Sequence, residues 1–166
     1  MAEVAHYVSL ALVSLFVLAV VYGAITDIAT FTIPNRVSYG ILLLFVVYAA
    51  LNWQRLPLAA HFGLGAFVTA LCILFWKLRW FGGGDAKFVG AIAFWMGPQD
   101  ILIFAILLSV VSALMIAILR LVRKWNDFFQ VSTWPSVAKT LIQKSAESAI
   151  PYGLPAAVAA LVALIT

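Results

Sequence analysis

The chain has 166 residues, of which 66% are hydrophobic and 10% are charged, and its mean hydropathy is +1.13. Soluble domains are about half apolar and about a quarter charged, so this composition excludes a soluble globule and a disordered chain. The net charge of +4 is expected to report membrane orientation rather than a nucleic-acid partner. We therefore expect a single membrane-embedded domain over residues 1–166.

Charge-free apolar stretches predict the membrane-spanning helices, since a helix needs about 20 mostly apolar residues to cross the hydrocarbon core. These stretches lack the period-two alternation of barrel strands, so the sequence predicts an all-α integral membrane protein. In chain order the six predicted spans are Val4–Thr26, Val37–Gln54, Leu56–Trp76, Phe88–Gln99, Ile101–Leu119 and Ser148–Thr166.

The distribution of Lys and Arg indicates whether the short fourth stretch crosses. With six crossings and an external N-terminus, 9 of the 10 basic residues face the cytoplasm and only Arg55 faces outward. Without the fourth crossing, 4 would face the cytoplasm and 6 would face outward. Because cytoplasmic loops are enriched in Lys and Arg, we predict a six-transmembrane-helix bundle with both termini outside.

The fourth span is short. Even from Asp85 to Pro98 a helix rises only about 20 Å, against a hydrocarbon core about 30 Å thick. Either the membrane thins at this helix, or the ends of the helix lie below the lipid surface inside the bundle. The second option would draw the preceding glycine-rich turn to the membrane boundary.

The longest polar stretch, Arg123–Glu147, separates the fifth and sixth spans on the cytoplasmic side. Apolar residues recur in it at helical spacing, at Trp134, Val137, Ala138, Leu141 and Ile142, with Lys139 and Lys144 among them. This pattern predicts a cytoplasmic amphipathic helix that lies on the membrane. A soluble connector is the alternative interpretation.

Asp27 directly follows the first span, at the expected cytoplasmic boundary. Ile33-Pro34-Asn35 then breaks the helical path, because the residue before proline is pushed out of the helical region, and Asn35 is placed to cap the second helix. An ionisable group at this depth is costly, and near a helix C-terminus a carboxylate also meets the negative end of the macrodipole. Asp27 is therefore a candidate functional residue, with a hydrated helix end as the alternative.

Three glycines, Gly82, Gly83 and Gly84, precede Asp85. They permit a turn that side chains would forbid, and they let another chain approach the backbone closely. Asp85 then opens the short helix, where an ordinary N-cap is the alternative role. A phosphate-binding loop is not indicated, because an acid repels phosphate and the GK[ST] pattern is absent.

Asp27 and Asp85 are both expected on the same side of the membrane and at similar depth. Two carboxylates that lie close together share a proton, since both cannot ionise easily. The ionised carboxylate can take a proton from water, and the neutral one can donate a hydrogen bond to a carbonyl oxygen. This is the chemistry of an aspartic peptidase, and it needs neither a metal nor a cofactor.

Three short motifs occur in order along the chain. They are Asp27 followed by Ile33-Pro34-Asn35, then Gly82-Gly83-Gly84-Asp85-Ala86-Lys87, and then Ile150-Pro151-Tyr152-Gly153 before the last span. In this order, and on six spans, they resemble the motifs of the type IV prepilin peptidases, which are GxGD membrane aspartic proteases.

The resemblance implies that Asp27 and Asp85 are the catalytic pair, and that the three glycines give the backbone of the substrate close access. It also implies removal of the leader peptide from a prepilin or pseudopilin on the cytoplasmic face of the bacterial inner membrane. The larger bifunctional members carry paired CxxC motifs and methylate the new N-terminus. This chain has only Cys72, so methyltransferase activity is not expected.

The compact chain resembles the short peptidases of tight-adherence (Flp-type) pilus systems, with the archaeal preflagellin peptidases as runner-up. A different class of function stays open, namely a non-enzymatic membrane scaffold or transporter subunit of a pilus or secretion assembly. In that case the two acids are helix-end residues and the bundle packs through small residues such as Gly63 and Gly65. The oligomeric state is not predicted.

Overall fold

A computed structural model describes residues 2–129 and 151–165, and every regular element in these ranges is an α-helix. In chain order the helices are α1 (Ala2–Thr30), α2 (Asn35–Leu51), α3 (Leu58–Lys77), α4 (Gly83–Trp95), α5 (Ile101–Phe129) and α7 (Gly153–Ala163). The all-helical prediction is therefore confirmed for this part of the chain. The predicted amphipathic segment around Trp134 and Lys139 lies outside the described residues.

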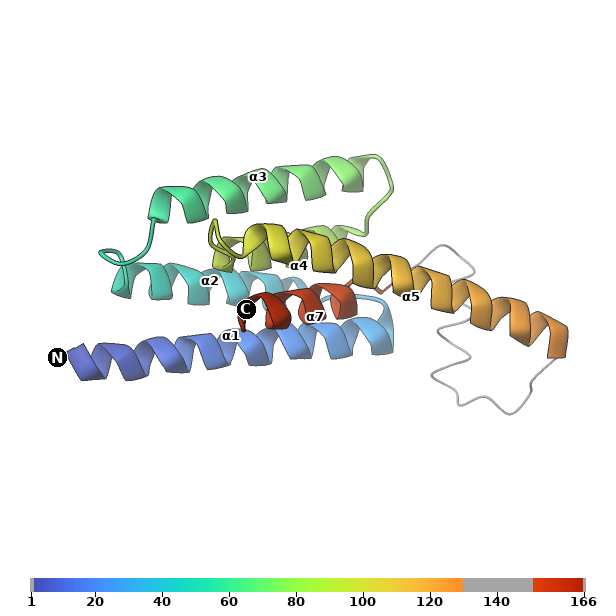
Figure 1. Cartoon of the computed structure of the whole chain (residues 1–166), viewed down its shortest axis with the longest axis horizontal. Coiled ribbons are helices and arrows are strands. Elements are labelled where there is room, and N and C mark those ends of the chain that lie inside the picture. Colours follow the sequence, from blue (N-terminus) through green and yellow to red (C-terminus); the bar gives the residue numbers. More distant parts are fainter. Residues whose placement is uncertain (1, 130–150, 166) are drawn as a thin grey trace.

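Three of the described helices are long and apolar enough to cross a membrane. They contain the candidate spans His6–Thr30, Leu58–Lys77 and Ile101–Val122. The helices α2, α4 and α7 have 17, 13 and 11 residues, so each rises less than the roughly 30 Å of a hydrocarbon core. Figure 1 shows them running alongside the longer helices, between the same two ends of the bundle. Six crossings remain a prediction.

The outward faces of the helices carry large apolar side chains. Leu18, Leu43 and Ile106 are all more than 60% exposed, at 64%, 65% and 62%. In water such a surface would be costly, because each buried methylene group contributes about 0.8 kcal/mol. These faces therefore suit contact with lipid chains.

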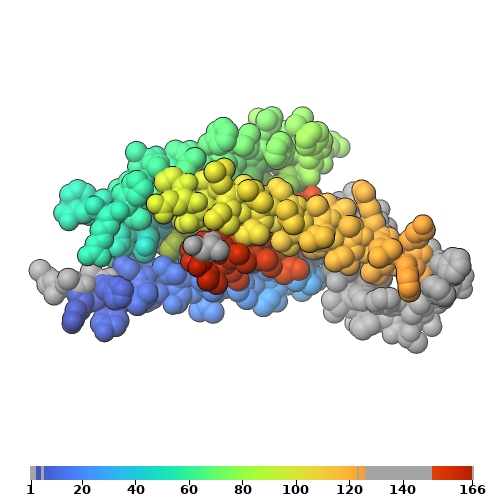
Figure 2. Space-filling view, in the orientation of Figure 1, coloured from blue at the N-terminus to red at the C-terminus, as the bar shows by residue number. Residues whose placement is uncertain are grey.

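The short helix α4 lies at the centre of the bundle. It packs mainly against α2 and α3 and more lightly against α7, while α7 also packs against α1 and α5. Figure 2 shows α7, in red, between α5 and α1 on one face of the molecule. The α4 side chains from Phe88 to Ala93 are all buried. This burial places the middle of α4 inside the bundle.

Trp95 fixes the last residue of α4 between α1 and α2. Its ring stacks on Phe16, with 4.3 Å between ring centroids, and on Tyr48, with 5.2 Å. Its indole Nε1–H donates a hydrogen bond to the backbone oxygen of Ile41 at 3.0 Å. A buried indole needs such a partner, so the position of α4 along α2 is set by a directional contact.

The start of α4 differs from the prediction. The helix begins at Gly83, two residues before the predicted opening at Asp85, and of the three glycines only Gly82 precedes it. None of the described glycines has a positive φ. The predicted glycine-rich turn is thus wrong, because Gly83 and Gly84 adopt helical backbone and Asp85 lies within the first helical turn rather than at its opening.

The far end of α5 also differs from the prediction, since the helix continues to Phe129 beyond the predicted Leu119. Charged residues end an apolar run without ending a helix, because Arg and Lys have high helix propensity.

The two glycines of α3 predict opposite effects of a single methyl group. A Cβ at Gly65 would lie 2.6 Å from the Phe94 ring, whereas a Cβ at Gly63 would meet nothing within 4 Å. We expect Gly65→Ala to lower stability by about 1–3 kcal/mol through overpacking. Gly63→Ala is expected to be neutral or to raise stability by up to about 1 kcal/mol, because alanine favours helix. Thermal unfolding of both variants in detergent tests this, and equal effects would contradict the close α3–α4 packing at Gly65.

Candidate active site

Asp27 lies in the last turn of α1 and is only 2% exposed. Its backbone oxygen accepts a hydrogen bond from the N–H of Phe31 at 2.7 Å. Phe31 has a φ of 54°, in the left-handed region that non-glycine residues rarely adopt, and this reversal ends α1. Pro34 then continues as extended backbone into α2. The chain therefore turns away one helical turn after Asp27, at Phe31, and leaves the Asp27 carboxylate inside the bundle.

The N-terminus of α7 holds the Asp27 carboxylate. The backbone N–H of Gly153 donates a hydrogen bond to Asp27 Oδ2 at 2.6 Å, across 126 residues of sequence. The positive end of the α7 dipole thereby offsets the unfavourable position of a carboxylate at the C-terminal end of α1. A Cβ at position 153 would lie 2.8 Å from both Cβ and Oδ2 of Asp27, so the contact requires glycine.

Asp85 lies in the first turn of α4 and is partly exposed. Its carboxylate turns back onto Gly82, where an added Cβ would collide with Asp85 Oδ2. Asp85 is also within electrostatic range of Asp27 and of Tyr152. The two acids that the sequence singled out thus come from different helices and lie within electrostatic range of each other.

Further contacts join the segments that carry the two acids. A Cβ at Gly84 would lie 3.5 Å from the backbone N and O of Ile33, so the two backbones approach closely. The Phe81 and Tyr152 rings pack with 4.6 Å between centroids. Three segments, here called the three-segment cluster, therefore meet at one end of the bundle: residues 27–35, 81–87 and 151–153. At this end α1 and α3 finish, and α2, α4 and α7 begin (Figure 1).

The type IV leader peptidase family matches residues 14–118, which is more than half of the chain. The chain belongs to this family. No curated protein matches the chain, and no solved structure matches it either. The predicted resemblance to this family is therefore confirmed, and the matched range contains Asp27 and Asp85.

In this leader peptidase each of the three glycines has a different neighbour. Gly82 lies against Asp85, Gly84 lies against the Ile33 backbone, and a Cβ at Gly83 would be 3.1 Å from the Trp76 indole nitrogen. Their observed role is therefore close packing around Asp85. The predicted access for the backbone of a substrate stays a prediction.

The predicted capping role of Asn35 is wrong. Asn35 is the first residue of α2, Pro34 occupies the cap position, and no side-chain hydrogen bond caps this helix. The Asn35 Oδ1 instead accepts a hydrogen bond from Lys87 Nζ at 2.9 Å. Asn35 thereby links α2 to α4, and Lys87 has a partner within the three-segment cluster.

Sequence reasoning left Tyr152 and Gly153 without a role, although they form part of the third motif. Their signal was a glycine directly after Pro151-Tyr152, at the start of an apolar run. What they contact depends on residues far away along the chain, which a local pattern does not reveal. Among residues 2–129 and 151–165, no group of three or more His, Cys, Asp or Glu side chains is placed to hold a metal.

The Gly153 contact predicts a sharp loss of activity from one methyl group. Gly153→Ala should displace Asp27, and the displacement should lower the rate of leader removal by roughly tenfold or more, since a buried charged group loses a hydrogen bond. Gly40→Ala is the matched control, because a Cβ there meets nothing within 4 Å. Cleavage assays with purified variants of verified helical content test this, and a fully active Gly153→Ala enzyme would contradict it.

Proposed function

We propose that this leader peptidase is an aspartic endopeptidase that removes the leader peptide from Flp-type type IV prepilins at the cytoplasmic boundary of the bacterial inner membrane. Asp27 and Asp85 are the proposed catalytic pair. The proposal rests on one observation: a buried Asp27 carboxylate, held by Gly153, lies within electrostatic range of Asp85. Membership of the family supports a peptidase reaction, and this pair of carboxylates supports an aspartic mechanism for it.

The proposed mechanism uses one water and one shared proton. The ionised carboxylate of the pair takes a proton from the water, whose oxygen attacks the carbonyl carbon of the scissile peptide bond. The neutral carboxyl group donates its proton to the carbonyl oxygen, which gives a tetrahedral gem-diol. The pair then donates one proton to the departing nitrogen as the C–N bond breaks, and it accepts one proton from a gem-diol hydroxyl. The products are an amine and a carboxylic acid, and the shared proton is restored. Because the two groups are coupled, their protons belong to the pair rather than to either residue.

The charge distribution supports the cytoplasmic side. Arg36, Lys77, Arg79 and Lys87 all lie in or next to the segments at the end of the bundle that carries the three-segment cluster. Cytoplasmic ends of membrane proteins are enriched in such residues. A prepilin with an apolar helix in the bilayer and its leader in the cytoplasm would present the junction between them at this depth. The Flp type of the substrate rests on the resemblance of the three motifs.

Removal of either acid should abolish cleavage and spare the fold. Asp27→Asn keeps an oxygen that can accept the hydrogen bond from Gly153, so the bundle should still assemble. We expect Asp27→Asn and Asp85→Asn each to slow leader removal by at least about 100-fold, the scale of general acid–base catalysis. Glu3→Gln, an exposed site at the other end of α1, is the control. Co-expression with a prepilin and N-terminal sequencing of the product gives the readout, and normal processing by either Asn variant would refute the assignment.

The alternative, a non-enzymatic scaffold or transporter subunit, does not require the two acids to lie close together, whereas a catalytic pair does. In a Cys72→Ser background, cysteines at positions 27 and 85 should cross-link efficiently with a short bifunctional reagent. Cysteines at positions 3 and 85, near opposite ends of the bundle, should not. Equal yields from the two pairs would remove the structural basis of the catalytic pair and favour the scaffold.

A further inference from the structure

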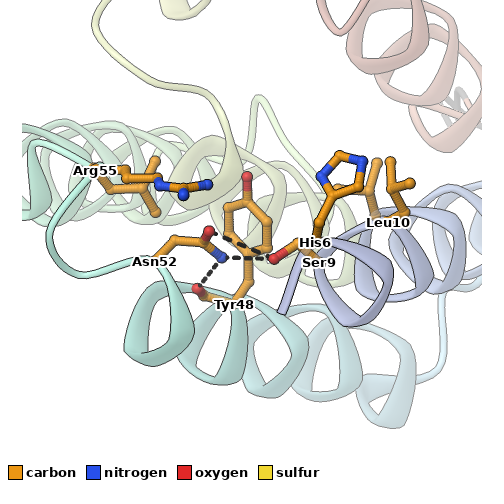
Figure 3. A pocket seen from close by; sticks show the side chains of 8 residues that line it. His6, Ser9, Leu10, Tyr48, Asn52 and Arg55 are labelled. Atoms are coloured by element: carbon orange, nitrogen blue, oxygen red, sulfur yellow. Dashed lines mark hydrogen bonds between the residues drawn. The ribbon is translucent and has the colours of Figure 1, made fainter. Parts of the chain in front are cut away.

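A second polar region lies at the end of the bundle opposite the three-segment cluster. One cavity of about 260 Å³ is lined by the start of α1 and the end of α2, with His6, Ser9, Asn52 and Arg55 in its wall. Figure 3 shows the Arg55 and His6 side chains on either side of the Tyr48 ring. The cavity combines cationic and hydrogen-bonding groups with apolar residues such as Leu10 and Leu56.

A second cavity of about 350 Å³ adjoins the first, since Val13, Tyr48, Arg55 and Leu56 line both. Trp95 and Asp100, at and beyond the end of α4, complete its wall together with the end of α7. We call the two together the outer double pocket. Its size falls in the roughly 300–1,000 Å³ range of small-molecule sites.

The wall of the first cavity is fixed by internal hydrogen bonds. The Asn52 amide donates to Ser9 Oγ at 3.0 Å and to the backbone oxygen of Tyr48 at 2.9 Å (Figure 3). These contacts join α1 to α2 and use both donors of Asn52. They leave the guanidinium of Arg55, with its five donors, as the strongest available group in the pocket.

Two opposite charges line the second cavity without neutralising each other. Within residues 2–129 and 151–165, neither the Arg55 guanidinium nor the Asp100 carboxylate has an ion-pair partner. Asp100 would repel a simple anion at its end of the cavity, and Arg55 would repel a simple cation. A ligand that carries both a negative and a positive group complements both charged side chains.

The depth of the double pocket indicates where such a ligand comes from. The candidate membrane spans begin at His6, Leu58 and Ile101, each at or next to a residue that lines the pocket. The pocket therefore lies where apolar helices meet water, which is the level of lipid headgroups. Its mixed polar and apolar walls suit a molecule that is itself amphiphilic.

The geometry points to a binding site for the headgroup of a zwitterionic phospholipid, with its phosphate at Arg55 and its primary ammonium at Asp100. Arg binds phosphate through several charge-assisted hydrogen bonds, and an ammonium donates to a carboxylate in the same way. Phosphatidylethanolamine has this chemistry, whereas phosphatidylglycerol has the phosphate without the ammonium. The site is separate from the proposed catalytic pair, and its occupancy is independent of peptide cleavage.

Native mass spectrometry of the full chain in detergent, titrated with each lipid, tests the assignment. We expect the protein to bind phosphatidylethanolamine about fivefold to tenfold more tightly than phosphatidylglycerol, the scale of one charge-assisted contact. Asp100→Asn should remove this preference, and Arg55→Gln should weaken the binding of both lipids. Arg55→Lys should keep part of the binding, because it retains the charge. Arg120→Gln, an exposed arginine near the other end of α5, should bind as the unmodified protein does.

Competition with soluble phosphoethanolamine distinguishes a membrane lipid from the free headgroup, since both carry the same phosphate and ammonium. If it does not displace the lipid at tenfold excess, the ligand is a membrane lipid, and if it does, the headgroup alone is sufficient. Equal binding of the two lipids by the unmodified protein, a preference that survives Asp100→Asn, or unchanged binding by Arg55→Gln would each overturn the proposal. Melting temperatures of all variants exclude unfolding as the cause of any loss.

Discussion

The arrangement of this membrane protein depends on the need to satisfy one buried carboxylate. Asp27 is almost fully withdrawn from solvent, and an unpaired carboxylate in that position would cost several kcal/mol. The backbone N–H of Gly153 removes part of that cost and requires the start of α7 to meet the end of α1. The polar contact therefore also sets the position of α7, which packs between α1 and α5.

The short helix α4 brings the second acid to this contact. Trp95 anchors one end of α4 against α1 and α2, and the close approach of Gly84 to Ile33 anchors the other. Asp85 lies one residue beyond that approach, so its position follows from the packing of the helix rather than from a flexible loop. A reacting group on a rigid element is held more accurately than one on a loop, and this supports the proposed role of Asp85.

The helices were predictable from the sequence because a long apolar run indicates a helix without any information about distant residues. The approximate positions of α1, α2, α3 and α5 follow from such runs, and Asp27 and Asp85 stood out as acids at their boundaries. Local sequence patterns predicted the role of a residue less well where that role depends on a contact with a residue far away in the sequence. Asn35 was predicted to cap α2 but instead accepts a hydrogen bond from Lys87. The role of Gly153 is visible only through its hydrogen bond to Asp27. The glycines before Asp85 suggested a turn, whereas two of them are helical and serve close packing.

The length of α4 has an electrical consequence. Its 13 residues rise only about 20 Å, and polar surface lies at both of its ends, with Lys87 on one side and the double pocket on the other. Lipid elsewhere separates the aqueous phases by about 30 Å. In the predicted six-span arrangement, in which α4 crosses the membrane, the voltage difference would fall over a shorter path along α4, and a charge moved along this helix would experience a steeper electric field than one moved through the surrounding bilayer.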